Sequence, residues 1–363
     1  MANWENERIA LFDNAKGLAI ILVAVGHAIE RSMTAHTSSH LAYATLAFIY
    51  FFHMPIFIFC SGLFAGRSWR KNKVAPIDKF VLYLALYLIF LLLILVLRLG
   101  TVGRIATFNP YAPAGTPWFL LTLATLMLLV PLLGHIRPVP LLVCSVVAAV
   151  GAGLLLPSNS ELSLLRTFTY LPYFAAGFYF TPERVQRCIM AVRRRLGTAR
   201  TMIAAALVLA AIFVVLYIAF DDTTLQGIKW MSTAWNLIDT VADSTGISKT
   251  VWTLFRILEY PFVIGMIALV FLALPQRHSY LTVVGERSLQ VYIFHMLLIY
   301  AAADLGFFSA VMDNNPYWFA CALLLGVCVP LLLALPKAPS TWVSALGAWC
   351  KRVCAPKEPP QSS

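Results

Sequence analysis

Long apolar segments separated by short polar ones run through almost the whole chain. A helix needs about 20 predominantly apolar residues to cross the hydrocarbon of a bilayer, and ten segments come close to that length. They cover residues 17–34, 42–65, 79–98, 117–134, 139–156, 168–181, 201–220, 251–274, 288–308 and 317–336. The pattern therefore predicts an all-α, polytopic membrane protein with about ten transmembrane helices.

The composition agrees with this pattern. Of the 363 residues, 60% are hydrophobic and 12% are charged, whereas soluble domains average about 45–50% apolar and about 25% charged residues. We expect residues 1–350 to form a single transmembrane domain and the polar, proline-rich residues 351–363 to form a short, disordered cytoplasmic tail. The largest polar segment, about 221–250, is long enough for a short lid or an interfacial helix.

The distribution of Lys and Arg predicts the orientation. An even number of spans places both termini on one side, and with that side cytoplasmic, twenty of the 27 basic residues lie in cytoplasmic segments, as the positive-inside rule requires. The seven on the outer side are Arg31, Arg98, Arg104, Arg166, Lys229, Lys249 and Arg256. This bias explains most of the net charge of +11 without a nucleic-acid partner. We therefore expect a multi-pass protein of the inner (plasma) membrane with cytoplasmic termini.

The first apolar segment carries ionisable residues, which are costly inside a membrane. Lys16 and His27 stand 11 residues apart in DNAKGLAIILVAVGH, so on a helix they share one face and are separated by about 16 Å along the axis. Asp13 precedes Lys16 by three residues and Glu30 follows His27 by three, so each basic group has an acid on the next turn. Such a polar stripe is typical of a helix that faces an internal cavity. A snorkelling Lys16 and a His27 in one interhelical hydrogen bond are the alternative.

Four stretches resemble the motifs of one known family. Residues 13–27 resemble the first-helix motif of the membrane-bound acyltransferase 3 family, in particular its branch related to fucose 4-O-acetylases, although the family usually has Arg at the position of Lys16. Residues 51–66 (FFHMPIFIFCSGLFAG), 117–123 (PWFLLTL) and 285–299 (GERSLQVYIFHMLLI) resemble later motifs, in the same order. The resemblance implies a ten-helix core that transfers an acyl group, usually acetyl, from cytoplasmic acyl-CoA to a hydroxyl of an exported or envelope molecule.

Within that reaction, His27 is the residue that we expect to act as the general base. A hydroxyl attacks a thioester poorly unless a base accepts its proton, and a neutral imidazole suits this role. Glu30, on the other ring nitrogen, would hold the tautomer and stabilise the cation that forms. A transient acyl-imidazole on His27 is the alternative mechanism. His53, just before Pro55, either orients a substrate or makes an interhelical hydrogen bond.

Two further groups of residues are candidates for substrate binding. At the cytoplasmic side, Lys16, Arg67 and Arg70 are expected to bind the anionic head of acetyl-CoA, because Arg pairs with phosphate; for the two arginines, plain positive-inside charge is the alternative. At the outer side, Trp118 is either an interfacial aromatic or a platform on which a sugar stacks. Tyr292 and His295 lie three residues apart on one helix face and either line the cavity or belong to the core.

Neither a metal site nor a permanently bound cofactor is expected. The histidines fall on separate helices, and the seven cysteines have no metal-ligand spacing. Acetyl-CoA is then a donor substrate, and the acceptor is a cell-envelope sugar or glycolipid. A transporter or flippase for a lipid-linked saccharide is the competing function, because it also requires about ten helices, a polar stripe and an outer aromatic site.

Overall fold

The computed structural model describes residues 9–35, 39–103, 110–111, 115–156, 161–233, 238–313 and 315–354. Within these ranges the chain is helical and contains no strand, which confirms the predicted all-α class. The long helices are α1 (Ala10–Ala35), α2 (His40–Asn72), α3 (Ile77–Val102), α4 (Trp118–Leu133), α5 (Pro138–Leu155), α6 (Leu164–Tyr179), α7 (Pro182–Leu196), α8 (Thr198–Ala219), α11 (Lys249–Ala273), α13 (Ser288–Asp304), α15 (Trp318–Leu333) and α16 (Ala338–Val353). Shorter elements are η1 (Glu161–Ser163), α9 (Asp222–Thr233), α10 (Ile238–Thr245), α12 (Tyr280–Glu286) and α14 (Phe307–Met312).

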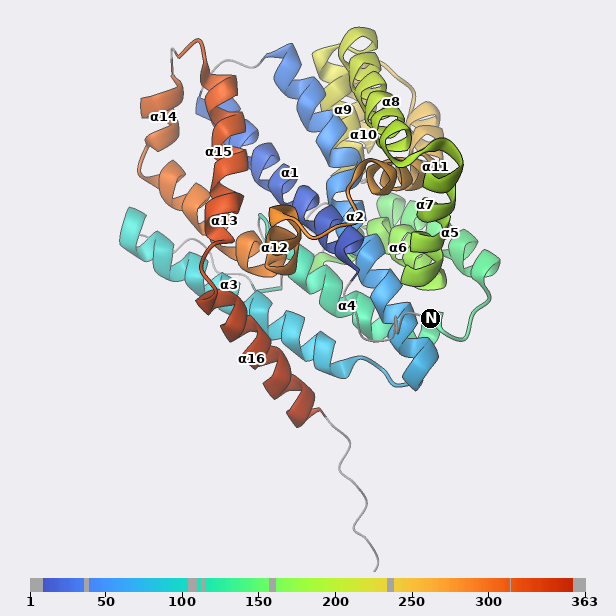
Figure 1. Ribbon diagram of the computed structural model, residues 1–363. Helices are drawn as coiled ribbons and strands as arrows, with labels where there is room; N and C mark the ends of the chain where they lie inside the picture. The colour runs from blue at the N-terminus through green and yellow to red at the C-terminus, as the bar shows by residue number, and fades with distance from the viewer. Residues whose placement is uncertain are drawn as a thin grey trace, which may run out of the picture.

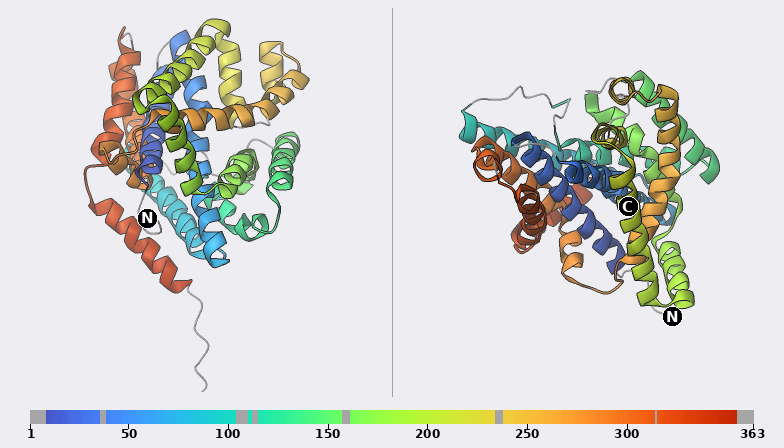
Figure 2. Two further views of the ribbon diagram at one scale, coloured as in Figure 1. Left: turned by 45° about the vertical axis from the view of Figure 1, so that its right-hand side comes forward. Right: turned by 90° about the horizontal axis from the view of Figure 1, so that it is seen from above.

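Helices α1 and α2 form the centre of the bundle and lie side by side (Figure 1). Helix α1 packs against α12, α13 and α15, whereas α2 packs against α6, α8 and α9. In the view from above in Figure 2, α15 and α16 (red) lie on one side of this centre and α7 and α8 (green) on the other. Along the apolar window of α2, 89% of the residues are buried, against 11% for α8. The outer helices therefore expose apolar side chains, as lipid-facing helices do.

Six helices of the described chain are long and apolar enough to cross a membrane: α1, α2, α3, α5, α8 and α11. Helices α15 and α16 meet at a bend of 62° and would add a seventh span as a broken pair, while α4 and α13 are shorter apolar helices. Each of the ten predicted segments overlaps a helix. The count of ten spans and the side of the termini stay predictions.

The last described helix reaches the residues where the tail was predicted to begin, and the domain bounds stay predictions. Helix α16 continues to Val353 and lies along α3 (Figure 1). Its residue Lys351 lines a cavity together with residues of α3. Packing against α3 therefore extends the ordered helix past the predicted start of the tail, and residues 355–363 lie outside the described chain.

Glycine contacts bring two pairs of helices, α2 with α6 and α1 with α12, unusually close together around the centre. A Cβ atom built on Gly62 of α2 would lie 2.2 Å from the carbonyl oxygen of Phe174 in α6, and one on Gly177 of α6 would lie 2.1 Å from that of Phe59 in α2. A Cβ atom on Gly285 of α12 would likewise lie 1.8 Å from the carbonyl oxygen of Asp13 in α1. Small residues allow such close backbone packing in membrane bundles. These contacts set the spacing of the helices that carry the candidate site.

Candidate active site

Two cavities lie along α1, one at each end of the predicted polar stripe. The first has a volume of about 920 Å³ and is lined by Lys16 of α1, the C-terminal half of α2, the N-terminal part of α3 and Lys351. The second has a volume of about 550 Å³ and is lined by His27 and Glu30 of α1, the N-terminal half of α2, and residues of α6, α9 and α13. The stripe on α1 thus faces internal space at both ends.

Met54 and Tyr292 line both cavities. Met54 lies near the middle of α2, and Tyr292 lies in α13 between Leu289, which lines the first cavity, and Met296, which lines the second. The Tyr292 ring packs edge-on against Phe119 and Phe90, and its hydroxyl donates a hydrogen bond to the carbonyl oxygen of Thr116. The two cavities therefore adjoin at Met54 and Tyr292.

His27 is held by the carboxylate on the next turn, as the spacing predicted. Its Nδ1 lies 3.3 Å from Oε2 of Glu30. The ammonium group of Lys229 in α9 pairs with Oε1 of the same carboxylate. Because a carboxylate only accepts hydrogen bonds, Nδ1 of a neutral His27 carries the proton and Nε2 keeps its lone pair. This is the arrangement that a general base requires.

His53 and His295 have the same tautomer for a different reason. Nδ1 of His53 lies 2.7 Å from the carbonyl oxygen of Ile49, and Nδ1 of His295 lies 2.8 Å from that of Val291. A carbonyl oxygen is also only an acceptor, so each Nε2 keeps its lone pair. His53 lines the second cavity. His295 is fully buried and stacks on the His27 ring at 5.9 Å between centroids, and its Nε2 has no hydrogen-bond partner among the described residues.

The residues predicted to bind the donor fall into two groups. Lys16 lines the first cavity and pairs with Asp13 at 2.7 Å. Arg70 donates to the carbonyl oxygens of Phe178 and Phe180 at 2.7 and 3.0 Å, and thereby satisfies backbone groups at the C-terminal end of α6. Arg67 pairs with Glu183 at the start of α7 at 3.3 Å. Neither arginine is among the described lining residues of the first cavity, so their role in donor binding stays a prediction.

Trp118 lines the second cavity, and its ring is part of an aromatic stack. Its ring is stacked on Tyr170 of α6, with 5.4 Å between centroids and an interplanar angle of 12°. The guanidinium carbon of Arg166 lies 5.0 Å from the Trp118 ring centroid. Trp118, Tyr170 and Arg166 all line the cavity, so the described part of the structure brings His27, Glu30, His53, Trp118 and Tyr292 to one place.

Comparison with known proteins identifies the family of the chain. The model of the acyltransferase 3 family, described as an acyltransferase domain, matches residues 9–335, which is most of the chain. The chain belongs to the acyltransferase 3 family. Two curated relatives are nodulation proteins NolL. The protein from Sinorhizobium fredii (strain NBRC 101917 / NGR234) is 29% identical over 184 residues, 48% of this chain and 49% of the relative. The protein from Mesorhizobium japonicum (strain LMG 29417 / CECT 9101 / MAFF 303099) is 27% identical over 183 residues, 48% of each chain.

The chain thus spans about half the length of the curated relatives it matches. No solved structure matches it. The family identifies a transferase that acts on acyl groups, and the apolar helices agree with a multi-pass membrane protein. For this acyltransferase, the second cavity is therefore the candidate active site.

Sequence reasoning missed Lys229, although it singled out the segment 221–250 as a possible lid. Helix α9, inside that segment, places Gln226, Lys229 and Trp230 at the second cavity of the acyltransferase. The Lys229 ammonium also lies 5.2 Å from the ring centroid of Tyr50, a further lining residue. The one available signal was the charge count, because Lys229 is one of the few basic residues assigned to the outer side.

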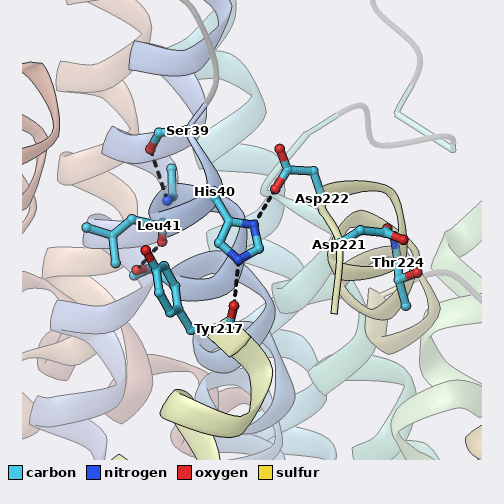
Figure 3. Close-up of polar contacts among 9 residues, drawn as sticks. Ser39, His40, Leu41, Tyr217, Asp221, Asp222 and Thr224 are labelled. Atoms are coloured by element: carbon cyan, nitrogen blue, oxygen red, sulfur yellow. Dashed lines mark hydrogen bonds and ion pairs between the residues drawn. The ribbon is translucent and has the colours of Figure 1, made fainter. Parts of the chain in front are cut away.

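The start of α9 is fastened to α2 and α8 (Figure 3). His40 at the start of α2 makes two contacts: Nδ1 lies 2.6 Å from Oδ1 of Asp222, and Nε2 lies 2.6 Å from the carbonyl oxygen of Tyr217. Both ring nitrogens face acceptors, so both contacts are hydrogen bonds only when the ring carries two protons. The backbone N–H of Thr224 donates to Asp221 at 2.7 Å, and this hydrogen bond lowers the pKa of the Asp221 carboxyl. These contacts fix the helix that positions Lys229.

Proposed function

We propose that this acyltransferase moves an acetyl group from cytoplasmic acetyl-CoA to a hydroxyl of a cell-envelope sugar or glycolipid, in the plasma membrane. The observation that carries the proposal is the pair of cavities that meet at Met54 and Tyr292, with Lys16 lining one and His27 the other. A donor and an acceptor that enter from opposite ends of α1 would meet at this junction. Transport of a saccharide does not require a cavity for each of two substrates.

The donor would occupy the first cavity. Lys16, Lys79 and Lys351 line it and supply positive charge for a nucleotide head, alongside Asp78 and Glu286. Lys16 and His27 are separated by about 16 Å along α1, a distance that the extended pantetheine arm would span. Arg67 and Arg70 lie at the same end of α2 as the lining residues Ser68 and Asn72. We propose that they add positive charge at the rim of the first cavity.

The acceptor hydroxyl would attack the thioester carbonyl while Nε2 of His27 takes its proton. The tetrahedral intermediate then collapses: the C–S bond breaks, the acetyl group stays on the acceptor oxygen, and the imidazolium returns the proton to the CoA thiolate. Glu30 accepts a hydrogen bond from Nδ1 throughout and stabilises the imidazolium. His53, with a lone pair on Nε2, is proposed to orient the acceptor, Trp118 to stack on its sugar ring, and Tyr292 and His295 to hold the junction and the His27 ring.

The test is acetyl transfer by purified protein in detergent, with radiolabelled acetyl-CoA and a glycolipid extract of the host envelope as the acceptor. We expect His27→Ala to lower the transfer rate by about 10²- to 10⁴-fold, the usual contribution of a general base, with CoA binding retained. The matched control is His135→Ala, because His135 is exposed and lines neither cavity. If wild type and His27→Ala transfer label equally, His27 is not the base.

The same purified protein and extract distinguish direct attack from an acyl-imidazole intermediate, and acetyl transfer from transport. Label that stays on the protein when the acceptor is omitted would indicate an acyl-imidazole, whereas its absence with intact transfer supports direct attack. A wild-type protein that binds the extract but never transfers label to it would favour the transporter.

A further inference from the structure

The second cavity is positively charged. Its described lining contains three cations, Arg31, Arg166 and Lys229, and a single carboxylate, that of Glu30. Glu30 is already engaged by His27 and Lys229. The described lining of the cavity therefore carries more positive than negative charge. A cavity of this kind attracts anions more strongly than open water does, because low-dielectric walls focus the field.

Arg166 is the cation best placed to bind such an anion. It lies in the first turn of α6, and no described carboxylate pairs with it. Its electrostatic neighbours are the phenol groups of Tyr50, Tyr170 and Tyr292, which also line the cavity. The guanidinium lies over the Trp118 ring, and in such a cation–π contact the N–H groups can still donate to an anion.

Thr116 provides a second, independent sign of a ligand. It lines the cavity, only 6% of its surface is exposed, and its Oγ1 has no hydrogen-bond partner among the described residues. Its carbonyl oxygen is used, because Tyr292 donates to it. A buried hydroxyl left without a partner costs free energy, and a bound acceptor atom would remove that cost.

The backbone just before α6, three to four residues from Arg166, adopts an uncommon conformation. Leu162 and Ser163 are consecutive residues with φ of +54° and +55°, a conformation that side chains other than glycine rarely adopt. The N–H of Leu162 donates to the carbonyl oxygen of Tyr111 at 2.6 Å. Strain of this kind persists where the surrounding structure holds it, and it is concentrated at binding sites.

We propose that the acceptor is an acidic saccharide whose carboxylate or phosphate binds Arg166 and the hydroxyl of Thr116. Arg166 would pair with the anion through two parallel N–H donors, Thr116 would donate its proton to it, and Trp118 would cover the sugar face. Lys229 and Arg31 raise the local concentration of the anion. This inference rests on the proposed acetyl transfer and adds the chemical class of the acceptor.

The first experiment identifies the acceptor pool. The glycoconjugates of the host envelope are separated on an anion-exchange column into acidic and neutral pools, and each pool is incubated with purified protein and radiolabelled acetyl-CoA. We expect at least about tenfold more label in the acidic pool, with transfer that weakens as salt rises. Phosphatase treatment of that pool abolishes acceptance if the anion is a phosphate and leaves it if the anion is a carboxylate.

The outcomes of this experiment test the acidic acceptor separately from acetyl transfer itself. Label that enters the neutral pool at least as well would overturn the acidic acceptor while leaving acetyl transfer standing. Label in neither pool, with acetyl-CoA recovered intact, would overturn acetyl transfer and the acidic acceptor with it.

The second experiment tests the subsite. We expect Arg166→Gln to raise KM for the acidic pool about 10- to 100-fold, as the loss of a charge-assisted hydrogen bond implies, with a smaller effect on kcat. Arg166→Lys should recover part of the loss, and Arg184→Gln, on an exposed residue of α7, should behave as wild type. Unchanged CoA binding shows that each variant is folded. A fall in kcat with KM unchanged would instead place Arg166 at the reacting carbonyl and refute the subsite.

Discussion

Replacing Gly62 by Ala tests the close contact between α2 and α6 directly. The added Cβ would lie 2.2 Å from the carbonyl oxygen of Phe174, and real Cβ contacts essentially never fall below 3.0 Å. The neighbour is backbone of a buried helix, so it cannot rotate away as a side chain would. The two helices must therefore separate by about 1 Å, a gap that forfeits roughly a quarter to a half of each dispersion contact across it.

The expected cost follows from this separation. Inserting a methyl group into a packed interface destabilises by about 1–3 kcal/mol, while Gly→Ala in a helix by itself stabilises by roughly 0.5–1 kcal/mol. We expect a net loss and an apparent melting temperature lower by on the order of a few degrees. Because α2 carries His53 and α6 carries Arg166, a displacement of about 1 Å should also lower the transfer rate by up to about 10²-fold.

Gly265→Ala in α11 is the matched control. No atom lies within 4 Å of a Cβ built there, so only the helix-propensity gain applies. Both variants are unfolded in detergent by heating, with tryptophan fluorescence as the signal and acetyl transfer measured in parallel. If Gly62→Ala melts at or above the temperature of Gly265→Ala, the two helices do not make the contact described.

Two further predictions concern α9. Lys229→Met removes the ammonium group that holds the Glu30 carboxylate beside His27, so the transfer rate should fall; an unchanged rate would show that Lys229 does not act through Glu30. The contacts at the start of α9 should give its amides greatest protection from hydrogen exchange in a middle pH range. Rising pH removes the second proton of His40 and one of its two hydrogen bonds. The hydrogen bond from the Thr224 N–H lowers the pKa of Asp221, and it weakens when falling pH protonates that carboxyl. If amide protection in His40→Gln depends on pH as it does in the wild type, His40 is not the cause of the loss of protection at higher pH.

What the sequence predicted about the site came from helix periodicity within one segment. The contacts of Lys16 with Asp13 and of His27 with Glu30 follow from a spacing of three residues, and both are present. The motif containing Gly62 was visible as a pattern, but the carbonyl of Phe174 that explains it lies more than a hundred residues away. The spacing of residues along the chain therefore predicted the contacts within α1. It did not predict which helices pack against α1 and α2.

The basic residues also show that local spacing does not predict contacts between helices. Arg70 was expected at the donor because basic residues follow the second apolar segment. Its guanidinium donates to the carbonyl oxygens of Phe178 and Phe180, which local spacing could not predict, and its role at the donor stays a prediction. Arg166 and Lys229 were visible only as exceptions to the positive-inside bias. Three of those seven exceptions, counting Arg31, line the second cavity. A basic residue on the sparsely charged side of a membrane protein is thus a useful sign of a binding site.

The division of α1, α2 and α13 into two halves explains why one apolar helix carries both Lys16 and His27. Each of these helices lines the first cavity with residues toward one end and the second cavity with residues toward the other, and the halves meet at Met54 and Tyr292. In the proposed transfer, an anionic donor and its acceptor would come from opposite sides of the membrane, and each would use its own end of these helices. Within that proposal an imidazole suits the role of the base, because its unperturbed pKa lies close to neutral pH. Thr116 connects the junction with the second cavity: its carbonyl oxygen accepts the hydrogen bond from Tyr292, and its buried hydroxyl has no hydrogen-bond partner among the described residues.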